Sequence, residues 1–306
     1  MPRVAFLGLG AIGTPMARHL ATDASSLVVW NRTAQRADAF AASHGVTAAR
    51  TPADAVRDAE VVITCLPTSR EVETLLGGAG GILEGIASGT VFIDCTSGDP
   101  ETSARIAGRL AMVGVSFLDA PVSGGTAGAE AGTLTVMVGG DAGLLEQVRP
   151  VLQRFGQKIV HCGPVGAGHA LKAVNNAMLA THIWATAEGL AVAARAGVDP
   201  AIALDVINAS SGRSNASMNL FPERVLTRAF PRTFRLALLD KDVGIAADVA
   251  RARRVPAPLL QLTAELYRLA HDALGDAADH VEAVRVVEQW AHTELAPRVA
   301  DRGTPS

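Results

Sequence analysis

The residues with the clearest chemical meaning lie near the start of the chain, in the segment Gly8-Leu9-Gly10-Ala11-Ile12-Gly13. This G-x-G-x-x-G spacing follows an apolar run typical of a strand and precedes a segment typical of a helix, which is the context in which the motif binds a dinucleotide. Gly8 permits a tight turn, Gly10 lets the backbone approach a pyrophosphate, and Gly13 lets helix and strand pack closely. The helix N-terminus then offers free N–H groups and a positive dipole end to the anion. We predict a dinucleotide site here; a glycine-rich turn without a ligand is the alternative.

The next strand, Leu27–Trp30, ends at Asn31-Arg32-Thr33. A carboxylate about 20 residues beyond the glycine motif binds the adenosine ribose in NAD-binding domains, and it would repel a 2′-phosphate. No Asp or Glu stands at this strand end, and Arg32 offers a guanidinium that can bind a phosphate. The three residues therefore favour NADP over NAD, although an arginine in a solvated loop is a common alternative.

Two further strand ends are expected to complete the cofactor site. Leu66-Pro67 follows the apolar run Val61–Cys65, and Thr96 follows Val91–Cys95. Ligands of open α/β sheets bind outside the carboxyl ends of the strands.

The first half of the chain alternates short β-rich runs with helical segments. This alternation predicts a parallel sheet that is covered by helices on both faces, in a doubly wound, Rossmann-like arrangement. The expected strands are Val4–Leu7, Leu27–Trp30, Val61–Cys65, Val91–Asp94, Phe117–Leu118, Leu134–Val138 and Ile159–His161.

The pattern changes after Gly163-Pro164, where β-rich runs stop and helical periodicity takes over. We therefore expect a dinucleotide-binding domain over residues 1–163. An all-α domain over 164–306 should begin with a long helix from Gly166 to about Ala196. The further expected helices are Pro200–Ala209, Leu236–Ala252, Pro258–Leu274 and Val281–His292.

Composition excludes several classes of protein. A hydrophobic fraction of 49% and a net charge of −3 fit a folded chain without a nucleic-acid-binding surface. The three cysteines, Cys65, Cys95 and Cys162, are widely spaced, and the histidines lack metal-ligand spacing. We expect reduced thiols, no metal site, no membrane span and a cytoplasmic location.

Several segments, together with the glycine motif, resemble the β-hydroxyacid dehydrogenases over about residues 4–291. They are Asp119-Ala120-Pro121-Val122-Ser123-Gly124-Gly125, Gly132-Thr133-Leu134, Gly166-Ala167-Gly168 with Lys172 and Asn175-Asn176, Ser210-Ser211-Gly212-Arg213-Ser214, and Lys241-Asp242. The resemblance implies an NAD(P)-dependent oxidoreductase of small β-hydroxyacids, closest to the members that convert 3-hydroxyisobutyrate to methylmalonate semialdehyde in valine breakdown.

The resemblance also implies residue roles. Lys172 is the expected general acid and base, and burial or a neighbouring cation such as Lys241 would suit it to that role at neutral pH. A lysine that extends to solvent is the alternative.

Ser123, Gly124 and Gly125 are expected to bind the substrate carboxylate through converging donors, unless they form an ordinary turn. Asn176, one helical turn after Lys172, is expected to bind substrate or to make a structural hydrogen bond, with Asn175 as a second candidate. Lys241 and Thr96 match positions that contact the cofactor, although an ion pair with Asp242 is an alternative for Lys241.

Other functions stay open at this point. NADPH-dependent reductases of glyoxylate, succinic semialdehyde or tartronate semialdehyde would retain the same lysine. A dinucleotide-sensing scaffold without catalysis is the non-enzymatic alternative. A homodimer or homotetramer is expected because symmetric assembly is common.

Overall fold

The computed structural model describes residues 2–21 and 26–297, and the chain divides into two compact units. Unit 1 spans Met1–Ala173 and unit 2 spans Val174–Ser306.

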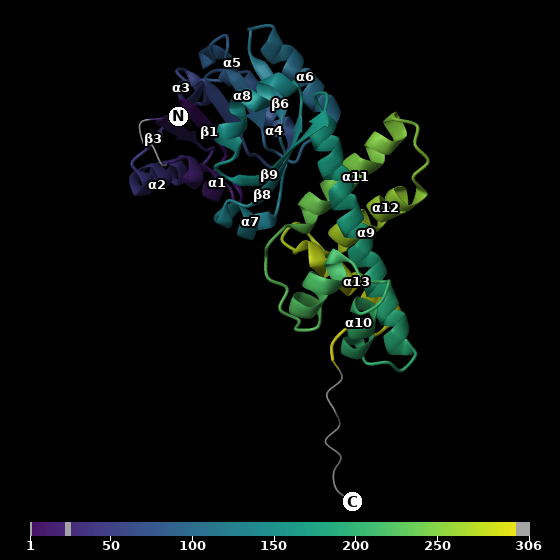
Figure 1. Ribbon diagram of the computed structural model, residues 1–306. Coiled ribbons are helices and arrows are strands. Elements are labelled where there is room, and N and C mark those ends of the chain that lie inside the picture. The colour runs from purple at the N-terminus through teal and green to yellow at the C-terminus, as the bar shows by residue number, and fades with distance from the viewer. Residues whose placement is uncertain (1, 22–25, 298–306) are drawn as a thin grey trace, which may run out of the picture. The chain divides into compact units, whose positions relative to one another are not determined.

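Unit 1 is built on one mixed sheet, with strand order β3-β2-β1-β4-β5-β6-β8-β7 and with β9 paired to β8 (Figure 1). Strands β1 to β6 pair in parallel, and Asp94 on β5 stands in register with Asp119 on β6. The strands are β1 (Val4–Leu7), β2 (Leu27–Trp30), β3 (Thr47–Ala48), β4 (Val61–Thr64), β5 (Val91–Asp94), β6 (Ser116–Asp119), β7 (Val122–Ser123), β8 (Leu134–Gly139) and β9 (Gly156–Gly163).

Helices cover both faces of this sheet, as predicted. Alternate side chains of β1 show why both faces need covering: Phe6 enters one core, with α1, α2 and α8, while Leu7 enters the other, with α3 to α6. The helices of unit 1 are α1 (Gly13–Leu20), α2 (Ala34–His44), α3 (Pro52–Val56), α4 (Ser69–Leu76), α5 (Ile82–Gly85), α6 (Pro100–Ala111), α7 (Gly125–Ala131) and α8 (Ala142–Leu152).

Side chains that accept amide hydrogen bonds fix several of these helix starts. Thr51, Thr68, Asp99 and Asp141 each cap the helix that follows, and Pro stands in the first turn of α3 and α6. Such caps satisfy amides that have no partner inside the helix.

One part of the sheet departs from the parallel pattern. Strand β8 runs antiparallel to β6 and β7, and parallel to β9. Strands β6 and β7 are separated only by Ala120-Pro121 and pair one after the other with β8, Asp119 opposite Gly139 and Val122 opposite Val136. The Rossmann-like architecture is confirmed, with a mixed edge in place of a fully parallel one.

Unit 2 is helical, as expected. Helix α9 (Ala167–Arg195) begins in unit 1 and continues into unit 2, and a π-helix, η2 (Ala216–Val225), was not predicted. The remaining elements are α10 (Pro200–Asn208), α11 (Leu236–Ala252), α12 (Pro258–Leu274), the 3-10 turn η3 (His280–Ala283) and α13 (Val284–Ala291).

An aromatic cluster joins α9, α12 and α13 inside unit 2. The Trp184 ring lies 5.9 Å from that of Tyr267 and 5.7 Å from that of Trp290, centroid to centroid. These tilted and edge-on geometries are favourable for aromatic pairs.

Within residues 2–21 and 26–297, no helix combines the length and apolar character needed to cross a membrane.

Candidate cofactor and catalytic sites

The glycine motif forms a turn that only glycine fits at two of its positions. Gly8 has φ +110°, and a Cβ there would collide with the Cys65 carbonyl oxygen. A Cβ on Gly13 would collide with the Gly8 carbonyl oxygen, so the start of α1 lies directly against the turn. At Gly10, by contrast, a Cβ would meet nothing within 4 Å. The backbone is therefore open where a pyrophosphate must approach, and the residues present fit a dinucleotide.

Asn31 supports this turn from the end of β2. Its Oδ1 accepts a hydrogen bond from the Leu9 N–H at 3.0 Å, and its Nδ2 donates to the Thr33 carbonyl oxygen at 3.0 Å. The Asn31 amide thus holds the glycine turn and the β2 end in one arrangement. Arg32 and Thr33 are exposed beside it.

The ends of β4 and β5 meet next to the same turn. Thr96 is buried, and its Oγ1 accepts a hydrogen bond from the Leu66 N–H at 3.1 Å. The Thr96 N–H donates to Asp94 Oδ1 at 3.0 Å. A Cβ on Gly8 would also contact the Leu66 side chain, so these strand ends adjoin the glycine turn, with Pro67 exposed.

The Ser-Gly-Gly segment follows β7 as a turn of open backbone. Gly124 and Gly125 have φ +134° and +63° and are exposed, while Ser123 is half-buried. A Cβ at Gly125 would meet nothing within 4 Å. The backbone is therefore open at Gly125, whereas a Cβ at Gly124 would lie 3.1 Å from Leu134 Cδ2. An open backbone position is what an anion cradle requires.

Asp119 secures the start of α9. Its Oδ1 accepts from the Gly166 N–H at 2.6 Å and its Oδ2 accepts from the His169 N–H at 2.9 Å. This fully buried carboxylate caps the helix at the positive end of its dipole. Lys172 follows in the next turn and is buried, with 9% of its surface exposed. A lysine that extends into open solvent does not fit this burial.

Unit 2 carries a second polar cluster, around Asp242 on α11. Asp242 Oδ2 accepts a hydrogen bond from Asn176 Nδ2 at 2.6 Å, and Asp242 Oδ1 lies 2.9 Å from Lys241 Nζ. Asn176 is buried, whereas Asn175 is exposed and donates to Asn176 Oδ1 at 3.2 Å. The structural hydrogen bond and the ion pair considered for Asn176 and Lys241 are thus both present.

Sequence reasoning did not select Asp94, Asp119 or Asp242 as site residues. Each is buried and bonds to one or more of the predicted segments. Their signal in the sequence is weak, because Asp119 and Asp242 lie inside the family motifs but their hydrogen-bond partners are distant in the sequence.

The thiols of the chain have pKa values raised above the ordinary value by burial. All three cysteines are free, and burial raises the pKa of the Cys65 thiol to about 12, with a further contribution from Asp94. The described part of the chain holds no group of three His, Cys, Asp or Glu side chains that would bind a metal.

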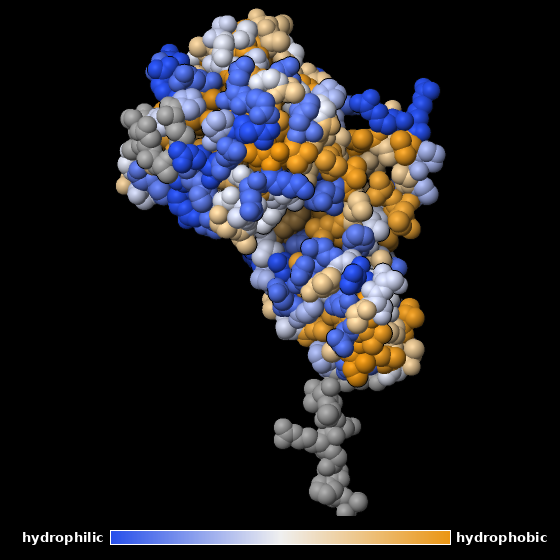
Figure 2. Space-filling view, in the orientation of Figure 1, coloured by the Kyte–Doolittle hydropathy of each residue, from blue (hydrophilic) through white to orange (hydrophobic). Residues whose placement is uncertain are grey.

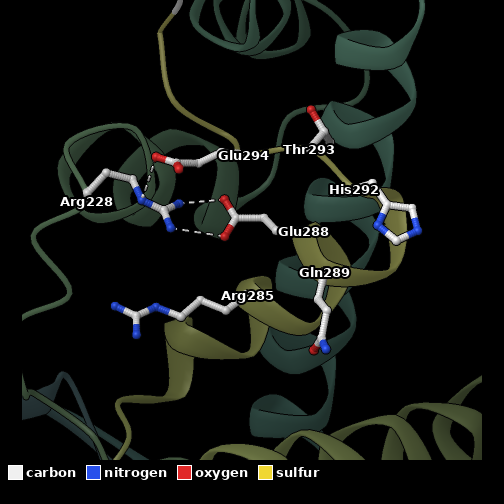
Figure 3. Close-up of a pocket in the computed structure, with 7 residues that line it drawn as sticks. All are labelled: Arg228, Arg285, Glu288, Gln289, His292, Thr293 and Glu294. Atoms are coloured by element: carbon white, nitrogen blue, oxygen red, sulfur yellow. Dashed lines mark hydrogen bonds and ion pairs between the residues drawn. The ribbon is translucent and has the colours of Figure 1, made fainter.

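A hollow of about 540 Å³ lies in unit 2, beside α13 (Figure 3). Arg228 faces it but binds Glu288 through two hydrogen bonds of 2.5 and 3.1 Å, and it also pairs with Glu294 at 3.4 Å. Glu288 additionally accepts from the Leu295 N–H. This cluster fastens the segment after α13, and none of the predicted site residues lines the hollow.

Comparison with known proteins places these features in a family. Residues 3–163 match the model of the NAD-binding domain of 6-phosphogluconate dehydrogenase. Residues 166–287 match the model described as NAD-binding of NADP-dependent 3-hydroxyisobutyrate dehydrogenase.

Individual relatives cover most of the chain. An NAD-dependent L-serine dehydrogenase of Pseudomonas aeruginosa is 38% identical over 88% of this chain and 92% of its own. A 3-hydroxyisobutyrate dehydrogenase of the same organism is 37% identical over 88% and 92%. The solved structure of Mycobacterium tuberculosis 3-hydroxyisobutyrate dehydrogenase with L-serine is 34% identical, covers 94% of this chain and 99% of its own, and superposes with a TM-score of 0.85.

The chain belongs to the β-hydroxyacid dehydrogenase family, which includes 3-hydroxyisobutyrate dehydrogenase and whose members are NAD(P)-dependent oxidoreductases acting on CH–OH groups.

Proposed function

We propose that this protein oxidises 3-hydroxyisobutyrate to methylmalonate semialdehyde with NADP, and that Lys172 is its general acid and base. The observation that carries the proposal is the burial of Lys172 on a helix whose start Asp119 caps. The same unit contains the open dinucleotide turn at Gly10.

Each residue has a defined task in this reaction. Lys172 Nζ takes the hydroxyl proton during oxidation and returns it during reduction. Ser123 and the amides of Gly124 and Gly125 bind the substrate carboxylate. The bound dinucleotide supplies the hydride acceptor. Asn176, oriented by Asp242, donates a hydrogen bond to the substrate, and Lys241 contacts the cofactor.

The NADP preference rests on the end of β2. Arg32 is exposed there, the segment Asn31–Thr33 contains no carboxylate, and the Asn31 amide is already engaged with Leu9 and Thr33. A guanidinium in this position suits a 2′-phosphate. The NAD dependence of the L-serine dehydrogenase relative makes NAD the alternative.

L-serine is a second candidate substrate. One relative is named for it, and the Mycobacterium tuberculosis structure contains it. L-serine is also a β-hydroxyacid, but it carries an ammonium group that needs its own partner. Reduction of glyoxylate, succinic semialdehyde or tartronate semialdehyde would use the same lysine.

The test is a comparison of initial rates on a substrate panel with NADP and NAD in parallel. The panel contains 3-hydroxyisobutyrate, L-serine, glycerate, 4-hydroxybutyrate and, in the reducing direction, glyoxylate. The highest kcat/KM with 3-hydroxyisobutyrate and NADP supports the proposal. A preference for another compound retains the mechanism and changes the substrate.

Lys172→Ala tests the assigned base. Loss of a general base lowers kcat by about 10²–10⁴-fold, while dinucleotide binding should persist. Lys158→Ala is the matched control, because Lys158 is an exposed lysine of the same unit. Near wild-type turnover in Lys172→Ala would reject this assignment. Cofactor binding without turnover by the wild type on any compound would favour the sensing scaffold.

We also infer that the protein is a homodimer or homotetramer. Figure 2 shows apolar surface on unit 2. Apolar side chains there are exposed at helical spacing, with Ile202 and Val206 on α10 and Leu259 and Leu262 on α12 each more than half exposed. Each pair lies on one face of its own helix, at i,i+4 on α10 and at i,i+3 on α12, and an exposed apolar face is the kind of surface that a second copy covers.

A further inference from the structure

Two buried polar atoms in unit 1 face each other without forming a hydrogen bond. Asp94 Oδ2 and His169 Nε2 are both buried and have no hydrogen-bond partner among the described residues. They are 4.0 Å apart, and both side chains are fully buried. Burying such groups without partners is costly, so an unpaired donor and acceptor that face each other call for an explanation.

The other atoms of both side chains are already engaged. Asp94 Oδ1 accepts from Thr64 Oγ1 at 2.8 Å and from the Thr96 N–H at 3.0 Å. His169 Nδ1 lies 2.6 Å from Ser103 Oγ. Only Oδ2 and Nε2 are left over. In the tautomer in which the Ser103 hydroxyl donates to Nδ1, Nε2 carries the ring proton and can donate it to the carboxylate oxygen. The chemistry of the pair is therefore that of a hydrogen bond whose closure needs a shift of about 1 Å.

A catalytic reading of this cluster fails. Ser103, His169 and Asp94 are a serine, a histidine and an aspartate in contact order, as in hydrolases. Ser103 is fully buried, however, and its hydroxyl also contacts the Asp99 carbonyl oxygen at 2.9 Å. No substrate reaches such a hydroxyl. The cluster therefore bears on how α9, the helix that carries His169, is positioned.

We propose that His169 is a positioning residue, which closes onto Asp94 and holds the first turn of α9 against the strand end that carries Thr96. The proposal rests on the assignment of Lys172 as the general acid and base. Lys172 lies three residues after His169 on α9, and Asp94 bonds the backbone of Thr96, whose Oγ1 binds the Leu66 N–H of the predicted cofactor site. One chain of contacts thus joins the catalytic helix to the cofactor edge.

Two surrounding features direct the imidazole toward Asp94. A Cβ on Gly98 would lie 2.9 Å from His169 Cε1, so the loop after Thr96 packs closely against the ring. The backbone N–H of His169 is separately held by Asp119, which stands in register with Asp94 on the neighbouring strand. Asp119 fixes where α9 starts, and the contact from the His169 side chain to Asp94 then determines how the first turn of α9 packs against β5.

The experiment compares two amide replacements of different length. His169→Gln retains an N–H donor that reaches Asp94, whereas His169→Asn retains only an acceptor oxygen that reaches the Ser103 hydroxyl. His161→Asn is the control, because it removes a histidine contact to the Gly140 carbonyl oxygen in the same unit without touching α9. Thermal unfolding confirms that each variant is folded before it is used.

The first readout is amide hydrogen exchange in the protein without substrate. For His169→Asn we expect exchange of the amides in residues 167–173 to accelerate about tenfold, which is the effect of losing one hydrogen bond on a local opening. His169→Gln and His161→Asn should leave that segment near wild type. Equal exchange in the Gln and Asn variants would overturn the Asp94 contact.

The second readout separates kcat from binding, with the best substrate of the panel. Misplacement of a catalytic group by about 1 Å lowers turnover by about 10²-fold, so kcat of His169→Asn should fall by about 10- to 100-fold. The dinucleotide Kd should change by less than about threefold, and His169→Gln should restore most of kcat. Faster exchange with unchanged kcat would overturn the positioning role.

The two proposals fail separately. Lys172→Ala reports on the base assignment alone, whereas the exchange pattern reports on the Asp94–His169 contact alone. If Lys172→Ala retains turnover, the proposed mechanism fails, and the exchange experiment still decides whether the contact exists.

Discussion

At the scale of single residues, Asn31 and Arg32 have different relations to the dinucleotide turn. Asn31 uses both ends of its amide inside the protein, on Leu9 and Thr33. Arg32 is exposed at the same strand end. Under the proposed function, we expect Asn31 to shape the turn for any dinucleotide and Arg32 to distinguish NADP from NAD.

This difference predicts that alanine substitutions at Asn31 and Arg32 change the affinities for NADP and NAD in different ways. Arg32→Ala should raise the Kd for NADP by about 10-fold or more and leave the Kd for NAD nearly unchanged, because a charge-assisted hydrogen bond contributes about 1.5–3 kcal/mol. Asn31→Ala should weaken both cofactors by a similar factor of about 2- to 10-fold, as expected for the loss of neutral hydrogen bonds. Fluorescence titration with both cofactors measures this. Equal losses for NADP and NAD in Arg32→Ala would reject the phosphate role.

At the scale of elements, a histidine ties α12 to α11 and to the loop after α12. His271 Nε2 lies 2.7 Å from Asp276 Oδ1, and His271 Nδ1 lies 2.8 Å from Asp240 Oδ2 on α11. These hydrogen bonds, first that with Asp276 and then that with Asp240, raise the pKa of His271 above its ordinary value of 6.5. Asp240 immediately precedes Lys241 and Asp242, so this contact braces the segment that carries them.

The raised pKa of His271 predicts a pH-dependent stability. A histidine whose pKa is higher in the folded than in the unfolded state stabilises the fold fully below the unfolded pKa, and the effect disappears as pH rises through the folded pKa. The difference in unfolding free energy between wild type and His271→Gln should therefore be larger at pH 6 than at pH 9. Urea unfolding at both pH values measures it. In an Asp276→Asn background, His271→Gln should cost less unfolding free energy at pH 6 than it does in the wild type. If His271→Gln lowers the unfolding free energy of the wild type equally at pH 6 and pH 9, the prediction is contradicted.

The sequence predicted elements that have a periodic apolar pattern and missed those that lack one. Helices α11 and α12 have the predicted bounds, and β1, β2 and β5 do as well. Strands β3 and β7 have only two residues each, too few for any pattern, and η2 contains Pro222, which suggests a break rather than a helix. Local pattern does not report such elements, because neighbours elsewhere in the chain stabilise them.

The predicted site shows the same division. The glycine turn is recognisable because its three glycines stand within six consecutive residues, and the steric limit on Gly13 comes from Gly8 inside the same motif. The capping of α9 by Asp119 and the bond from Asn176 to Asp242 join residues 47 and 66 positions apart. A sequence shows such partners only as separate polar residues, and the tertiary fold brings them together.

At the scale of the whole molecule, the exposed apolar side chains on α10 and α12 of unit 2 predict self-association. Replacing Leu259 and Leu262 together by Glu places two charges in the surface proposed to be covered by another copy. Sedimentation velocity should show the wild type as a dimer or tetramer and the double variant shifted toward monomer. Met112→Glu is the control, since Met112 is exposed in unit 1. A monomeric wild type would contradict the assembly.

The capping of α9 by Asp119 also limits how the protein can be truncated. A fragment that stops at Gly163-Pro164 ends before Gly166 and His169, whose amides satisfy this buried carboxylate. An unpaired buried charge destabilises a domain by about 3–5 kcal/mol, a large share of the about 5–15 kcal/mol that holds a typical domain folded. Residues 1–163 alone should therefore melt well below residues 1–180 in calorimetry. A chimera with a relative should therefore be joined within α9, after Gly163-Pro164 and after the first turns of the helix. These turns then stay with the dinucleotide-binding unit whose Asp119 they satisfy.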